Sequence, residues 1–320
     1  MRAMTRVSRV DFHGYAGCIE LANDVVRAVL GPHCGGRVLA YERRGENALA
    51  LDPAQAGWVH RPGAPGSDPA IDPAVDPWGG RFDVGPEKVL PAHPTLWLGA
   101  WTATVEDDRV RLESAPDAAT GLRLTRTFRL DPRSSHLRCT QTITNVSGEA
   151  RRCFHWGRSL SPGGGIAVVP LTPPSRFPHG WVQYDTHEPL LRFAPEDPGV
   201  RAAHGCLVIA PPLAHPKLGF DSEAGWLAYL LRPGLLFAKR WHTFPGRDHG
   251  DIGAFTLSLW MWRDRLCELE PIGPTERLAP GASASFTEDW WLLDHPFPGS
   301  PEALDVRGVV ERVESDARVG

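Results

Sequence analysis

The stretch LRLTRTFRLDPRSSHLRCTQTITNVS, residues 122–147, predicts two antiparallel strands joined by a short turn. Leu124, Phe128 and Leu130 alternate with polar residues before the turn, and Leu137 and Ile143 do so after it. Residues two apart in a strand point to the same face, so this alternation is typical of β structure. The intervening DPRSSH is rich in residue types that favour turns, and we expect the whole stretch to fold as a hairpin.

The same pattern recurs along the chain and predicts an all-β fold. Further hairpins are expected in CIELANDVVRAVLGP (residues 18–32), WLAYLLRPGLLFAKRWHTF (226–244) and GAFTLSLWMWRDRLCELEPIG (253–273). The sequence before residue 298 has no sustained amphipathic run of helical length, and no repeat of fixed period is visible. We expect one large antiparallel β-sandwich domain over residues 1–297, with a long loop at 52–77 and a polar C-terminal tail at 298–320.

Composition argues against several classes of function. The 320 residues carry a net charge of only −4, and the arginines are scattered among acids, which argues against a nucleic-acid partner. The first residues lack the apolar stretch of a signal peptide, and no apolar run approaches the roughly 18 residues of a membrane helix. The six cysteines form no C-x-x-C motif, so we expect a reducing, cytoplasmic location; monomer and homodimer both stay open.

The segment CELEP, residues 267–271, places two glutamates on one side of an expected strand. Glu268 and Glu270 are two residues apart, so their carboxylates leave the sheet together. Neighbouring like charges cost energy and can raise a pKa. Either this face is wet, or the pair has a chemical task.

Several stretches together resemble the galactose mutarotase-like (aldose 1-epimerase-like) superfamily, which are large β-sandwich proteins. They are NDVVRAVLGPHCGGRVLAYERRGENAL (residues 23–49), FRLDPRSSHLRCTQTITNVSGEARRCFHW (128–156), LFAKRWHTFPGRDHGDIGAF (236–255) followed by CELEP, and ERLAPGASASFTEDWWL (276–292). The resemblance spans roughly residues 18–293. It is most similar to a bacterial branch of relatives of the epimerases, and it implies the supersandwich fold of that superfamily.

The resemblance also implies a chemistry and two residues for it. Mutarotation needs an acid that protonates the sugar ring oxygen and a base that removes the proton of the anomeric hydroxyl. His155 follows the TN-x-S-G turn at the family's spacing and is the expected acid, although HWGRS replaces the residues that usually surround it. Glu270, before Pro271, is the expected base, with Glu268 beside it. Neither a metal nor an organic cofactor is required.

Other polar residues are candidates for binding the sugar. The family's second histidine has no clean counterpart; His93 lies in about the right region, with Arg81 and Glu87 nearby. Lys239 and His242, on opposite faces of one expected strand, add basic groups that would suit an acidic sugar such as a uronate.

The sequence is compatible with three classes of function. The first is an isomerase that interconverts sugar anomers; the second is a glycoside hydrolase or polysaccharide lyase acting on acidic sugars; the third is a carbohydrate-binding module without turnover. His249 and Asp251 in RDHGD have metal-ligand chemistry, but two ligands without a third form a weak signal, so no metal is expected.

Overall fold

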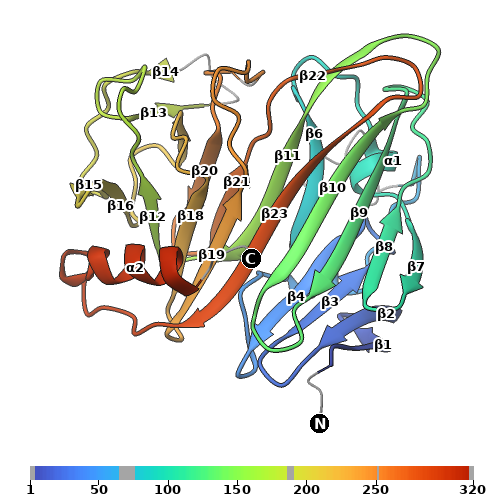
Figure 1. Ribbon diagram of the computed structural model, residues 1–320, viewed down its shortest axis with the longest axis horizontal. Helices are drawn as coiled ribbons and strands as arrows, with labels where there is room; N and C mark the ends of the chain where they lie inside the picture. The colour runs from blue at the N-terminus through green and yellow to red at the C-terminus, as the bar shows by residue number, and fades with distance from the viewer. Residues whose placement is uncertain (1–3, 65–75, 186–190, 251, 317–320) are drawn as a thin grey trace.

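The computed structural model describes residues 4–64, 76–185, 191–250 and 252–316, and these fold into two large sheets (Figure 1). Sheet A runs, in spatial order, through β1 (Arg6–Phe12), β2 (Tyr15–Ala22), β3 (Arg27–Gly31), β4 (Arg37–Arg43), β6 (Gly80–Gly85), β11 (Arg151–Pro162), β21 (Leu266–Pro271), β20 (Leu257–Trp262), β17 (Lys217–Phe220), β13 (Trp181–Tyr184) and β14 (Leu191–Arg192). Two short strands join it at the side, β5 (Glu46–Asn47) on β4 and β22 (Glu276–Leu278) on β11.

Sheet B packs on sheet A and is antiparallel as well. Its spatial order is β15 (Val200–Ala203), β16 (Cys206–Ile209), β12 (Ile166–Pro170), β18 (Trp226–Leu231), β19 (Leu235–Trp241), β23 (Ser283–Asp294), β10 (Leu137–Asn145), β9 (Leu122–Leu130), β8 (Arg109–Glu113) and β7 (Thr102–Glu106). The expected fold class, an all-β antiparallel sandwich, is confirmed.

The hairpins expected from the alternating pattern form with continuous registers. Leu137 pairs with Leu130 across the turn between β9 and β10, and Leu231 pairs with Leu235 between β18 and β19. The turn between β20 and β21 contains Arg263, whose φ of 55° lies in the left-handed region. Local residue patterns therefore decided strand pairing in these parts of the chain.

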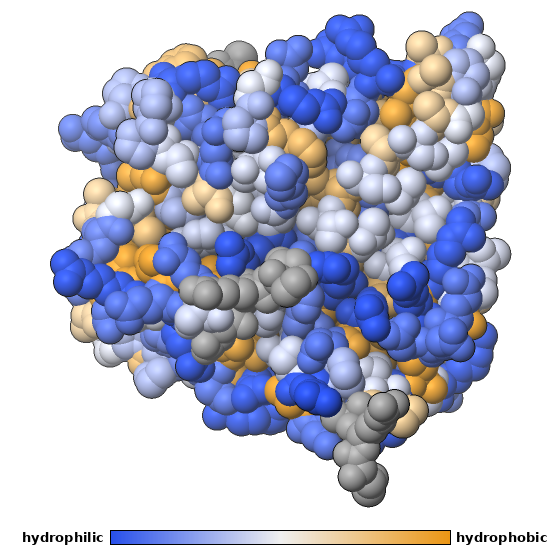
Figure 2. Space-filling model, in the orientation of Figure 1, coloured by the Kyte–Doolittle hydropathy of each residue, from blue (hydrophilic) through white to orange (hydrophobic). Residues whose placement is uncertain are grey.

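The main apolar core lies between the two sheets. It includes Phe82 of β6, Leu269 of β21, Phe128 of β9 and Phe237 of β19, all with no exposed surface. On β9, β10 and β23 the alternate residues point outward from sheet B, where hydroxyl groups pair across the strands, as between Thr142 and Ser285. Figure 2 shows this side of the molecule as mainly hydrophilic, with scattered apolar patches.

The C-terminal segment, expected as a polar tail, contains the helix α2 (Val306–Asp316). Val306, Val309 and Val313 recur at helical spacing and are buried against the outer face of sheet B. The other helical segments are short: η1 (Pro53–Gln55), α1 (Pro94–Trp97) and η2 (Pro301–Ala303). Within the described residues, no helix combines the length and apolarity needed to cross a membrane.

A buried ion pair on sheet B points into the space between the two sheets. The Nζ atom of Lys239, on β19, lies 2.7 Å from Glu288 Oε2, on β23, and both side chains are almost completely buried. Gln141 and the indole of Trp290 donate to the two oxygens of Glu288. Gly157 on β11 faces this group, since a Cβ there would stand only 1.9 Å from Glu288 Oε1.

Truncation of Glu288 tests this interaction. Glu288→Ala leaves Lys239 without its carboxylate partner in the core, and we expect the free energy of unfolding to fall by about 3–5 kcal/mol in urea denaturation. The control is Asp294→Asn, which breaks the half-exposed pair with Arg43 and should cost at most about 1 kcal/mol. Equal effects of the two substitutions would contradict the interpretation.

Candidate functional site

The outer face of sheet A carries a buried cluster of charged side chains. Five neighbouring strands supply it: β6, β11, β21, β20 and β17. Its members are Arg81, Asp83, Trp156, Arg158, Lys217, Ser258, Glu268 and Glu270. Because residues two apart share a face, the even-numbered residues of β11 and β21 all point to this side, away from sheet B.

Glu270 lies at the centre of the cluster. One of its carboxylate oxygens accepts hydrogen bonds, and the other has no partner among the described residues. Its Oε2 accepts hydrogen bonds from Lys217 Nζ, at 2.5 Å, and from the Ser258 hydroxyl. Its Oε1 is buried and has no hydrogen-bond partner among the described residues; the nearest cation is Arg158, whose Nε is 3.6 Å away. A buried acceptor without a partner is unusual and indicates a position where a ligand can donate.

Glu268 is held quite differently from Glu270. Arg158 binds it with both forks of its guanidinium, Nε to Oε1 at 2.7 Å and Nη2 to Oε2 at 3.2 Å. Such a bidentate pair is the strongest type of side-chain ion pair. The two glutamates are therefore not interchangeable carboxyl groups.

The electrostatic surroundings separate the pKa values of the two carboxyls. Burial raises the pKa of Glu270 to about 7, with the charge of Glu268 adding to the effect and that of Lys217 opposing it. Burial alone would also raise the pKa of Glu268, but the charges of Arg158 and Lys217 outweigh burial and hold it well below its usual range. Glu270 can thus exchange a proton near neutral pH, whereas Glu268 stays ionised.

The cluster extends through β6 to His93, and we call Asp83 and His93 the His93 arm. His93, at the start of α1, places its Nε2 3.0 Å from Asp83 Oδ1 and its Nδ1 2.8 Å from the carbonyl of Pro91. Burial alone would lower the pKa of His93, but the bond to Asp83 raises it to about 9. Asp83 is also 3.9 Å from Arg158, so this arm connects to the glutamates. Both ring nitrogens of His93 are engaged, which makes it a positioning residue.

A cavity of about 310 Å³ opens beside Lys217, the partner of Glu270. We call it the Trp156 cavity; it is lined by Pro86, Glu87, Lys88, Val89, Trp156, Tyr184, Lys217, Gly250 and Ile252. The buried indole nitrogen of Trp156 has no hydrogen-bond partner among the described residues. The guanidinium of Arg158 lies 4.3 Å from the ring centre. An aromatic ring and an ammonium group thus line this cavity, and the buried carboxylate of Glu270 lies behind the ammonium group of Lys217.

The structure corrects the role expected for His155. On β11 the alternation places Trp156 and Arg158 outside, so His155 points into the space between the sheets, on the opposite side from Glu270. Its ring is stacked between Phe82 and Phe286, with centroid distances of 5.7 and 5.8 Å. Burial lowers the pKa of His155 to about 4, so it is a neutral core residue and not the acid.

The other expected site residues divide into two groups. Arg81, Glu87, His93, Glu268 and Glu270 gather on the outer face of sheet A or at the rim of its cavity. Arg81 is paired with Asp76 and stacks over Trp97. Lys239 instead pairs with Glu288 between the sheets, and His242 is exposed just beyond the end of β19 in sheet B. These last two expectations are also corrected.

Sequence reasoning missed Trp156, Arg158, Lys217 and Ser258. Trp156 and Arg158 follow His155 at one and three positions, on the other side of the strand. The signal was the alternation itself, but both faces of β11 are buried, so the pattern does not distinguish them. Of the weak metal motif, Asp251 lies outside the described residues. Within the described chain, no group of three ligand side chains could hold a metal ion, and all six cysteines are free and buried.

Comparison with known proteins places the fold. No protein-family model matches the sequence, and no curated protein does. Solved structures match over most of their length. A galactose mutarotase-like protein from Lactobacillus casei is 12% identical, with 86% of this chain and 100% of that chain covered at a TM-score of 0.58. The chain has the galactose mutarotase-like fold.

Two further structures agree on this fold. A galactose mutarotase-like protein from Clostridium acetobutylicum is 12% identical over 91% of this chain and 99% of that chain, with a TM-score of 0.56. A galactose mutarotase related enzyme from Lactobacillus acidophilus is 10% identical over 87% of this chain and 98% of that chain, with a TM-score of 0.58. Identities this low make the likeness one of fold.

The pKa values of the buried His93 and His155 should be shifted in opposite directions from the ordinary value of 6.5. Following the imidazole signals by NMR, we expect His93 to lose its proton near pH 9 and His155 to gain one only near pH 4. Since the folded pKa of His93 exceeds its ordinary value of 6.5, its contribution of about 3 kcal/mol to stability is fully present below pH 6.5 and is lost as the pH rises through 9.

His93→Gln should remove this loss of stability between pH 6.5 and 9, measured by urea unfolding at each pH. The exposed His242→Gln is the matched control and should leave the pH dependence unchanged. A normal titration of His93 near pH 6.5 would contradict the ion pair with Asp83.

Proposed function

We propose that this protein is a carbohydrate-active isomerase that interconverts the anomers of a sugar at the Trp156 cavity. The observation that carries the proposal is the vacant Oε1 of Glu270, a buried carboxyl group with a pKa of about 7. The galactose mutarotase-like fold supports the same class of chemistry. The sugar ring would lie against Trp156, whose indole supplies an apolar face and a free N–H donor.

Ring opening then needs two proton transfers. Glu270 takes the proton from the anomeric hydroxyl, and the C1–O bond to the ring oxygen breaks as the carbonyl forms. The ring oxygen keeps the electron pair of that bond and receives a proton from the Lys217 ammonium. Lys217 lies 2.5 Å from Glu270 and lines the cavity, so the two groups can also return the proton to one another. Closure on the other face of the carbonyl reverses these steps.

The remaining charged residues hold this pair in place. Arg158 keeps Glu268 ionised, and the negative charge of Glu268 contributes to the raised pKa of Glu270. The ion pair of His93 with Asp83 fixes the neighbouring arm. No step requires a metal ion or an organic cofactor.

Binding of a sugar without turnover is the second candidate. It is favoured by the complete burial of Glu270 beneath Lys217, because a ligand has to move Lys217 before it reaches the carboxyl group. A two-carboxylate hydrolase is less well supported. Glu270 could be its proton donor, but the second carboxylate has to act as nucleophile or base, and Arg158 binds both oxygens of Glu268.

Substitution of Glu270 decides between turnover and binding. In Glu270→Gln the base is lost with little change of shape, and we expect anomer exchange, measured by NMR magnetisation transfer on a panel of aldoses and uronates, to slow by roughly 10²–10⁴-fold. The wild-type rate should fall tenfold per pH unit below about pH 7, because the base must be deprotonated. Glu42→Gln, which breaks an ion pair with Arg27 at 2.6 Å elsewhere in sheet A, is the matched control.

Exchange in Glu270→Gln as fast as in the wild type would exclude Glu270 as the base. Sugar binding by isothermal titration calorimetry, without any acceleration of exchange in the wild type, would establish the binding module instead.

A further inference from the structure

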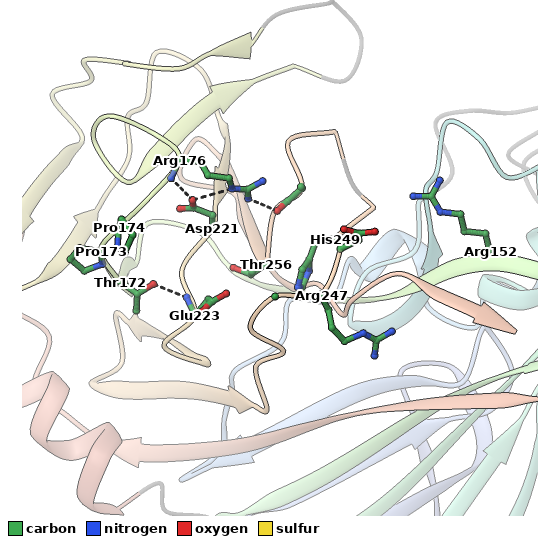
Figure 3. Close-up of a pocket in the computed structure, with 13 residues that line it drawn as sticks. Arg152, Thr172, Pro173, Pro174, Arg176, Asp221, Glu223, Arg247, His249 and Thr256 are labelled. Atoms are coloured by element: carbon green, nitrogen blue, oxygen red, sulfur yellow. Dashed lines mark hydrogen bonds and ion pairs between the residues drawn. The ribbon is translucent and has the colours of Figure 1, made fainter.

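A larger cavity, of about 620 Å³, lies outside the cluster around Glu270. We call it the Arg176 cavity. Figure 3 shows Arg176 and Asp221 on one side, with Thr172 and Glu223 near them, and His249 and Arg152 toward the other. Most of the lining residues are polar or charged; Ala254 and the two prolines on the loop that follows β12, Pro173 and Pro174, are apolar.

The two cavities open on the same face of sheet A. On β11, Arg152 lines the Arg176 cavity, and Trp156, four residues later, lines the Trp156 cavity. Lys217 and Asp221 show the same spacing of four residues along and just past β17. Because side chains repeat every second residue, Arg152, Trp156 and Lys217 point outward from sheet A. Four residues of strand correspond to about 13 Å, which sets the spacing of the cavities along the strands.

One short segment separates the cavities. His249 lines the Arg176 cavity, whereas the next residue, Gly250, lines the Trp156 cavity. Gly250 lies directly over Phe154, since a Cβ on Gly250 would stand 3.0 Å from the phenyl ring. A ligand that extends from one cavity to the other would therefore cross a thin wall with no side chain at Gly250.

The Arg176 cavity contains both donors and acceptors that are not committed elsewhere. Among the described residues, Arg152 and Glu223 have no ion-pair partner, and the buried Nδ1 of His249 has no hydrogen-bond partner. Arg176 and Asp221, by contrast, bind each other. Hydroxyl groups both donate and accept hydrogen bonds, so they match such a mixture.

The charge of the lining also selects the ligand. Arg152, Arg176 and Arg247 are balanced by Asp221, Glu223 and Asp248. A polyanion would meet three carboxylates, and desolvating these without compensation is costly. A neutral polyhydroxylated ligand meets no such penalty.

We propose that the Arg176 cavity is a subsite for further units of an oligosaccharide whose reducing-end sugar occupies the Trp156 cavity. The inference rests on the proposed function, because anomer exchange takes place only at the reducing end, where the hemiacetal is free. The rest of the chain then extends along sheet A toward Arg152. The substrate class is a short neutral oligosaccharide with a free reducing end.

Chain-length dependence tests this subsite. The probes are gluco-, manno- and galacto-oligosaccharides of one to four units, with affinity measured by calorimetry and exchange at the reducing end measured by NMR. For the series that binds, we expect affinity to rise at least tenfold between one unit and the length that reaches the Arg176 cavity. In the double variant Arg152→Ala/Glu223→Gln, the ratio of oligosaccharide to monosaccharide affinity should fall toward one. Arg277→Ala is the matched control, because Arg277, on β22, lies opposite Arg152 of β11 in the strand register and does not line the cavity.

The outcomes separate the two proposals. The subsite is overturned if the wild type binds all chain lengths with equal affinity. It is also overturned if the double variant keeps the wild-type ratio of oligosaccharide to monosaccharide affinity. Both conclusions hold even when monosaccharide exchange is fast. Chain-length-dependent binding that the double variant loses, without any exchange at the reducing end, keeps the subsite and overturns the isomerase. Failure of every saccharide to bind overturns both.

Discussion

The bidentate ion pair between Arg158 and Glu268 is the interaction on which the chemistry of the outer face depends. Two glutamates on one side of β21 would repel each other if both were unpaired. Arg158 relieves this repulsion by neutralising Glu268, because it binds both oxygens of that residue. It leaves Oε1 of Glu270 without a hydrogen-bond partner among the described residues. The same guanidinium contacts Asp83 and stacks on Trp156. One residue thus connects the carboxyl pair, the His93 arm and the wall of the cavity.

The fold was predictable from the sequence because its elements are local. The hairpins at residues 122–147 and 253–273 each contain their strands and turn in one contiguous stretch, so alternation and turn chemistry were sufficient. Glu268 and Glu270 were placed together for the same reason, since they belong to one strand. The C-terminal helix was less predictable. The valines of α2 have a helical spacing, but the helix is stabilised by packing against strands of sheet B that are distant in the sequence.

The site was only partly predictable, because it is assembled from strands far apart in sequence. Lys217 meets Glu270 only because β17 and β21 lie on either side of β20, and nothing local in the sequence marks that arrangement. The prediction that His155 is the acid was wrong for another physical reason. Both faces of β11 are covered, one by sheet B and the other by the cluster of Phe154, Trp156 and Phe255, so hydrophobicity gave no indication of which face holds the cavity.

Among the described residues, Lys239 with Glu288 and Lys217 with Glu270 are close lysine–glutamate pairs, and comparing them shows why the proposed chemistry is assigned to the second. Lys239 and Glu288 lie 2.7 Å apart between the sheets, and both oxygens of Glu288 accept hydrogen bonds. Protonation of Glu288 would therefore disrupt one of these hydrogen bonds. Lys217 and Glu270 lie 2.5 Å apart, but Lys217 is partly exposed where it borders the Trp156 cavity, and Oε1 of Glu270 has no partner among the described residues. Burial costs free energy in both places. Only the second pair leaves a buried acceptor without a partner among the described residues, and the proposed catalysis rests on this difference.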